Sequence, residues 1–69
     1  MSLTEIKERV QAIQECAGDY EIAHSKEDAL YQDFIEFVAT SKDLDIAEVQ
    51  EKAAEVLKTK QIEFIRYCA

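Results

Sequence analysis

The stretch SLTEIKERVQAIQECAG, residues 2–18, carries the signals of a complete amphipathic helix. Ser2 and Glu5 have the spacing of a capping box, in which the serine hydroxyl accepts from the Glu5 amide while the glutamate returns to the Ser2 amide. Gly18 is the only glycine of the chain and suits the left-handed conformation that often ends a helix. We therefore predict a helix over residues 3–16. Its apolar stripe consists of Leu3, Ile6, Val10, Ile13 and Ala17.

A second start signal precedes the last third of the chain. Asp45 and Glu48 repeat the capping-box spacing, and Leu44 and Val49 occupy the two positions of a hydrophobic staple. Apolar residues then stay on one face at helical spacing almost to the C-terminus, which predicts a helix from residue 46 to nearly the end. These residues are Ile46, Val49, Ala53, Val56, Leu57, Phe64 and Tyr67.

The middle segment forms a third helix with two possible starts. Asp19 can cap it early, which gives a helix of about twenty residues, or Ser25 can cap it late. Its inner face consists of Ala23, Leu30, Phe34, Phe37 and Val38. Residues 40–44 connect this helix to the last one. The sequence contains no proline. We predict an all-α fold, a small three-helix up-down-up bundle that spans residues 1–69 as one domain.

The size of the chain limits its core. A chain of 69 residues is small enough that a single core rarely supplies more than about 3–5 kcal/mol without a disulfide, a metal, oligomerisation or very regular helix packing. Association with a second copy would relieve this shortage.

Charge and cysteine content exclude several classes of partner. Fifteen acidic residues against eight basic ones give a net charge of −7, which repels nucleic acids and anionic membrane surfaces. No apolar run approaches the roughly 20 residues of a membrane span. Two cysteines without a secretory signal predict a cytoplasmic protein with reduced thiols. A Cys16–Cys68 disulfide is the alternative if the two ends of the chain meet.

The segment EIAHSKEDALY, residues 21–31, contains the only histidine. Glu21 and His24 have the i, i+3 spacing of di-iron carboxylate bundles, which makes them candidate metal ligands. Such sites need a second pair and further glutamates, so a dimer would have to supply them, with Glu51 or Glu55 as the extra ligand. We find no nucleophile, glycine-rich phosphate loop or paired-acid cleft beside His24, and we predict no enzyme activity and no cofactor.

A structural interpretation of the same segment is preferred. Ser25, Glu27 and Asp28 can start a helix and complement its dipole, while His24 satisfies a neighbouring backbone group.

Four apolar residues lie outside the predicted inner faces. Tyr31 and Ile35 lie on the flank of the middle helix, and Ile62 and Ile65 lie away from the inward face of the last helix. Residues of these types are common at the centres of interfaces, so we predict that the four bind a partner. In the alternative, the N-terminal end of the first helix covers Ile62 or Ile65.

Two segments, AHSKEDALY at residues 23–31 and LKTKQIEFIRYCA at residues 57–69, resemble a set of small uncharacterised helical proteins of bacterial and phage genomes. In that set, a histidine followed by an acidic pair and a leucine precedes a helix, and the chain stops soon after an aromatic residue, an arginine and another aromatic. The resemblance covers residues 20–69 and carries no assigned activity.

The resemblance implies that the two segments are linked. Arg66 would pair with Glu27 or Asp28, and the ring of Tyr67, with Phe64 nearby, would close the bundle over His24. His24, Glu27, Asp28 and Arg66 would then form a structural polar tie between the middle helix and the C-terminus.

These observations lead to three functional hypotheses. The first is a small acidic protein–protein interaction module that self-associates as a homo-oligomer or binds an unknown protein partner. The second is an acidic inhibitor or nucleic-acid mimic that occupies a basic site on a phage or host protein. The third is a dimeric carboxylate–histidine metal protein.

Overall fold

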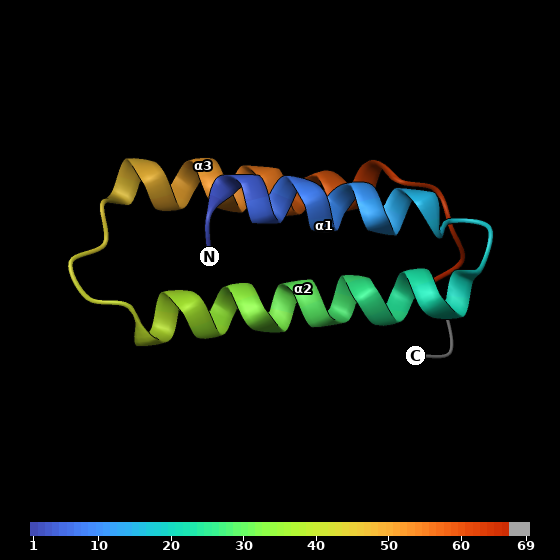
Figure 1. Ribbon diagram of the computed structural model, residues 1–69, viewed down its shortest axis with the longest axis horizontal. Coiled ribbons are helices and arrows are strands. Elements are labelled where there is room, and N and C mark those ends of the chain that lie inside the picture. The colour runs from blue at the N-terminus through green and yellow to red at the C-terminus, as the bar shows by residue number, and fades with distance from the viewer. Residues whose placement is uncertain (67–69) are drawn as a thin grey trace.

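The computed structural model describes residues 1–66 of the chain and contains three helices. They are α1 (Leu3–Glu15), α2 (Tyr20–Thr40) and α3 (Ile46–Leu57), and a short 3₁₀ helix, η1 (Lys58–Gln61), follows α3 directly. The helices run up, down and up along a body of 38 × 19 × 15 Å, with α1 beside α3 and α2 antiparallel to both (Figure 1). The all-α three-helix bundle predicted from the sequence is confirmed.

The first two helices begin at capping residues that the sequence identifies. The Ser2 hydroxyl accepts a hydrogen bond from the Glu5 amide at 3.1 Å. The Asp19 carboxylate accepts one from the Ile22 amide at 3.3 Å, so the earlier of the two possible starts of α2 is correct. Ser25 consequently lies inside α2.

Two predicted details of the helix ends are wrong. Asp45 is the residue before α3, but its side chain makes no capping hydrogen bond. Gly18 does not adopt a positive φ. Instead, α1 ends at Cys16, whose amide reaches the carbonyls of Ala12 and Ile13 and whose carbonyl accepts from the Asp19 amide at 2.8 Å. Because these bonds close the turn within ordinary backbone angles, no left-handed residue is needed there.

The core forms mainly around α1, which packs closely against both other helices, whereas α2 and α3 contact each other less. Its buried hydrophobic residues are Ile6, Ile13, Ala23, Leu30 and Val56. Partly buried residues surround them, namely Met1, Val10, Cys16, Tyr31, Phe34, Ile62 and Phe64. The core is therefore thin, and the side where α2 faces α3 is its least covered part.

The end of α3 differs from the prediction. The helix stops at Leu57, the chain tightens into η1, and it is extended by Ile62, with φ −81° and ψ 125°. We call residues 62–66 the tail. This path turns the chain back over the end of the bundle, so that Ile62 and Phe64 reach the core from the tail and not from a helical stripe.

The buried residues also differ from those that the sequence predicts on the inner faces. Ile46, Val38 and Leu57 were expected on inner faces, yet they are 69%, 36% and 59% exposed. Glu27 and Thr59 are instead buried, at 2% and 0%. Polar side chains thus occupy part of the interior at the end of the bundle where the tail lies. The predicted inward position of Tyr67 falls outside the described residues.

Candidate functional site

Glu27 lies in the interior because of its position on α2. It is four residues after Ala23 and three before Leu30, both fully buried, and the side chain of Glu27 is only 3% exposed. A buried carboxylate is costly unless it is paired and hydrogen-bonded. Arg66 supplies both requirements, since its Nε donates to Oε1 at 3.0 Å and its Nη2 to Oε2 at 3.3 Å. This bidentate geometry is the strongest that a carboxylate offers to arginine.

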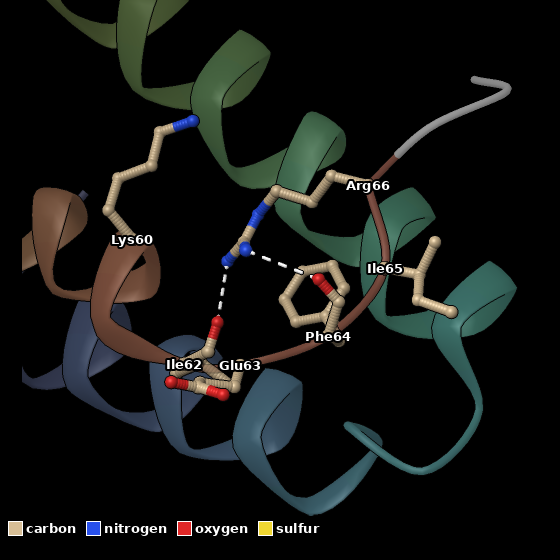
Figure 2. A pocket seen from close by; sticks show the side chains of 6 residues that line it. All are labelled: Lys60, Ile62, Glu63, Phe64, Ile65 and Arg66. Carbon is tan, nitrogen blue, oxygen red and sulfur yellow. Dashed lines mark hydrogen bonds between the residues drawn. The ribbon is translucent and has the colours of Figure 1, made fainter.

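The remaining donors of Arg66 hold the tail itself. Its Nη2 also donates to the carbonyl oxygens of Thr59, at 2.7 Å, and Ile62, at 2.9 Å. Its Nη1 donates to the carbonyl of Phe64 at 3.4 Å, and the guanidinium carbon lies 3.8 Å from the centre of the Phe64 ring. Figure 2 shows the bonds to Ile62 and Phe64. Arg66 therefore fixes the fold-back of the chain from several directions.

The environment of Glu27 keeps its carboxyl group ionised. Burial on its own raises the pKa of Glu27, but hydrogen bonds from Arg66 and Thr59 and the positive charges of Arg66 and Lys60 lower it. The lowering effects prevail, so the pKa of Glu27 lies below its ordinary value of 4.5. Glu27 is consequently a fixed anion at neutral pH.

Two hydroxyl groups complete this arrangement. The hydroxyls of Tyr31 and Thr59 are 2.7 Å apart, and the Thr59 side chain also hydrogen-bonds the Glu27 carboxylate. Either hydroxyl can donate in the bond between Tyr31 and Thr59. We call Glu27, Tyr31, Thr59 and Arg66 the polar network. Among residues 1–66, no buried side-chain nitrogen or oxygen lacks a hydrogen-bond partner. The side chains of the polar network thus bind one another and the tail.

The polar network differs in part from the predicted polar tie. Of the two acids expected as partners of Arg66, Glu27 is the one that the arginine contacts. His24 instead pairs with Asp28 one helical turn away, with Nε2 3.3 Å from Oδ2 and Asp28 65% exposed. The expected contact between Tyr67 and His24 lies outside the described residues.

Sequence reasoning missed the roles of Tyr31 and Thr59 in the polar network. Thr59 stands three residues after the buried Val56, and this spacing could have identified it as an inward-facing position.

Within residues 1–66, no further metal-binding side chains gather around the candidate ligands Glu21 and His24. Glu21 is exposed and His24 is half-buried. In the part of the chain that the structure describes, no three side chains of the types His, Cys, Asp or Glu come close enough together to hold a metal ion. Cys68, and with it the alternative of a disulfide to Cys16, falls outside that part. None of the helices within residues 1–66 has both the length and the apolar character that crossing a membrane requires.

An apolar hollow of about 280 Å³ lies between α2 and α3, and its lining is almost entirely hydrocarbon. We call it the α2–α3 groove. Ile35 and Leu57 stand on its two sides and are 66% and 59% exposed. The residues that line it are Tyr31, Phe34, Ile35, Ala53, Val56 and Leu57. Large aliphatic side chains thus face solvent beside an empty apolar surface.

Further apolar residues extend this face along both helices. Val38 follows Ile35 by three residues, and Ile46 precedes Leu57 by eleven, which places each pair within about 60° on its helix. Seven large hydrophobic residues are exposed within residues 1–66. Four of them belong to the face between α2 and α3, namely Ile35, Val38, Ile46 and Leu57. The exposed hydrophobic surface is therefore concentrated and not scattered.

Several exposed residues near Ile35 on α2 and near Leu57 on α3 carry no charge. They are Gln32, Ala39, Ala47, Gln50 and Ala54. The charged residues Glu36 and Lys58, which directly follow Ile35 and Leu57, are also exposed. Asp28 and Lys60 lie at one end of this face, where the Lys60 ammonium is 5.6 Å from the centre of the Tyr31 ring.

The four predicted partner-binding residues do not form one surface. Tyr31 and Ile35 line the α2–α3 groove. Ile62, expected on the outside, packs against the core, and Ile65 is 46% exposed on the tail. Both isoleucines line a separate, more polar hollow of about 450 Å³ at the end of the bundle (Figure 2). Its other lining residues are Lys60, Glu63, Phe64 and Arg66.

Comparison with known proteins gives no further guidance, because no family model, no curated protein and no solved structure matches this chain. The resemblance to small bacterial and phage proteins therefore stays an expectation.

Proposed function

We propose that this protein is an interaction module that associates with a second copy of itself through the α2–α3 groove. The observation that carries the proposal is the position of Ile35 and Leu57, two aliphatic side chains that are more than half exposed on either side of an apolar hollow. Contiguous apolar surface of this kind is typical of a binding site.

The energetics favour a weak and reversible association. Removing the exposed part of Ile35 and of Leu57 from water contributes about 1–2 kcal/mol for each side chain, and a dimer buries both of them twice. Val38 adds a smaller amount, because it is 36% exposed. The loss of translational and rotational freedom offsets much of this gain, so we expect a weak association.

The charge distribution supports a second copy as the occupant. Two chains of net charge −7 repel each other, but the repulsion depends on how close the charges come at the contact. Gln32, Ala39, Gln50 and Ala54, which lie beside the groove, add no charge to that contact. A two-fold axis would place the α2 side of one groove, with Ile35, against the α3 side of the other, with Leu57, as an isologous interface requires.

Sedimentation equilibrium of the wild type and of two groove variants tests the proposal. We expect wild-type protein to pass from monomer to dimer as its concentration rises through the dissociation constant. Ile35→Gln and Leu57→Gln should stay monomeric while their helical circular dichroism is unchanged, because both positions are mainly exposed in the monomer. Ile22→Gln is the matched control, since Ile22 is also an exposed isoleucine but lies outside both the groove and the tail. A wild type that remains monomeric at the highest concentration would contradict the proposal.

Salt dependence separates this function from that of an acidic inhibitor. Association through an uncharged apolar face should strengthen slightly with added salt, because screening reduces the repulsion between two acidic chains. Binding of a basic partner by an acidic mimic would instead weaken steeply as salt increases.

A further inference from the structure

Tyr31 belongs both to the α2–α3 groove and to the polar network. Its ring lines the groove, and its hydroxyl is 2.7 Å from that of Thr59. The ammonium of Lys60 lies 5.6 Å from the centre of the same ring. One side chain therefore connects the apolar surface with the polar interior.

Short contacts link Tyr31 to the tail. The carbonyl oxygen of Thr59 accepts from Nη2 of Arg66 at 2.7 Å, and Nε of Arg66 donates to Glu27 at 3.0 Å. Thr59 is fully buried and the Glu27 side chain is 3% exposed. Water cannot readily replace a missing partner at these positions, so the loss of one contact leaves its neighbours unsatisfied. Thr59 therefore contacts Arg66 through its backbone carbonyl and Tyr31 through its hydroxyl.

We propose that docking of the tail through Arg66 controls self-association at the α2–α3 groove, with Tyr31 as the residue that couples the two. When Arg66 binds Glu27 and Thr59, the Tyr31 hydroxyl is held and its ring forms a fixed wall of the groove. When the tail is released, the ring is free to move and the second copy binds less tightly. This inference rests on the proposed function, since it concerns the regulation of the same groove.

The physical basis is preorganisation of the binding surface. A side chain that is already immobilised in the monomer loses less freedom on binding than one that must be ordered, and the difference appears in the affinity. The coupling is reciprocal, so dimerisation must stabilise the docked tail by the same factor by which the docked tail strengthens dimerisation.

Two single variants and their combination test the coupling by sedimentation equilibrium. Tyr31→Phe keeps the ring and removes the hydroxyl, and Arg66→Gln removes the ion pair. We expect each to weaken dimerisation about three- to tenfold, the equivalent of ordering one additional side chain on binding. The double variant should be no weaker than the weaker single variant, because both changes break the same connection. Arg9→Gln is the control: it also loses a cation and an ion pair, with Asp33 at 2.8 Å, but away from the polar network.

A second measurement uses the reciprocal effect and requires no mutation of the tail. The Nε–H of Arg66 donates to Oε1 of Glu27 at 3.0 Å, so the hydrogen exchange of this side-chain group reports whether the tail is docked. In the wild type this exchange should slow as dimer forms, and in Tyr31→Phe the slowing should be lost. In the sedimentation experiment, Arg66→Lys replaces Arg66→Gln if the latter does not fold.

The possible outcomes separate the two proposals. Dissociation constants for Tyr31→Phe and the Arg66 variant within twofold of wild type, or effects that multiply in the double variant, would overturn the coupling and leave the groove dimer intact. A wild type that never dimerises would overturn both.

Discussion

The guanidinium of Arg66 lies against the carboxylate of Glu27, 39 residues earlier in the chain, with Nε 3.0 Å from Oε1. The Glu27 side chain is 3% exposed and that of Arg66 is 27% exposed. Because the acid is buried on α2 and the base is on the tail, this ion pair holds the last described residues against the bundle.

Replacing Arg66 should destabilise the protein far more than replacing an exposed arginine. Arg66→Gln leaves a buried carboxylate without its cation, a change that costs about 3–5 kcal/mol and approaches the whole stability expected of so small a core. Arg66→Lys keeps the charge but loses the bidentate geometry, and it should cost less. Urea unfolding followed by circular dichroism at neutral pH measures both.

Arg9→Gln is the control for this prediction. Arg9 pairs with Asp33 on the surface, where the side chains are 28% and 48% exposed, so its loss should cost no more than about 1 kcal/mol. Equal losses for the two glutamine variants would show that the Arg66–Glu27 pair is no more important than a surface pair.

Stability should decline in acid through Glu27. Its pKa is lowered in the folded state, so its contribution is fully present above the ordinary value of 4.5 and is lost as the pH falls through the lowered folded value. The free energy of unfolding of the wild type should therefore fall toward that of Glu27→Gln as the pH decreases below 4.5. The other carboxylates titrate in both proteins and largely cancel in the difference. A difference that stays constant from neutral to acid pH would contradict the assignment.

The two aspartates that precede helices should respond differently to the same substitution. Asp19→Ala removes the hydrogen bond to the Ile22 amide and should cost about 1 kcal/mol. Asp45 makes no such bond, so Asp45→Ala should lose only its interaction with the dipole of α3, at most about 0.5 kcal/mol. Thermal unfolding of the two variants provides the comparison, and a larger loss at Asp45 would contradict the structure at the start of α3.

His24 should contribute little to stability. Its partner Asp28 is 65% exposed and one helical turn away, and such pairs contribute about 0.3–0.5 kcal/mol. His24→Gln should therefore unfold within about 0.5 kcal/mol of wild type. Iron, manganese or zinc should not raise the midpoint of thermal unfolding of either protein. A metal-dependent rise that His24→Gln abolishes would revive the hypothesis of a metal site.

The helices were predictable because their signals are local. Ser2 with Glu5 and Asp19 with Ile22 are three residues apart, and the period of the apolar residues identifies the faces of α1 and α2. The end of α3 was not predictable in this way, since the sequence after Leu57 keeps a helical period and contains no proline or glycine. The helix ends there because Ile62 and Phe64 gain core contacts and Arg66 gains Glu27, which are contacts between distant parts of the chain.

The candidate site was predictable only in part for the same reason. The helical period of the sequence showed that Tyr31 and Ile35 lie outside the inner face of the middle helix. That Leu57 would face the same groove depended on where α3 ended and how it was rotated. Thr59 was overlooked because a threonine within an amphipathic pattern carries no sign of the tyrosine and arginine that it will meet.

The fold-back of the tail also sets an order of events for the nascent chain. Helices α1 and α2 can form from contacts between neighbouring residues as soon as they are synthesised, but the end of the bundle around Glu27 cannot close until residue 66 has been added. Before that point the carboxylate lacks its cation and the apolar surface that Ile62 and Phe64 will cover is open to water. This end of the bundle should therefore be the last part of the described chain to close during synthesis.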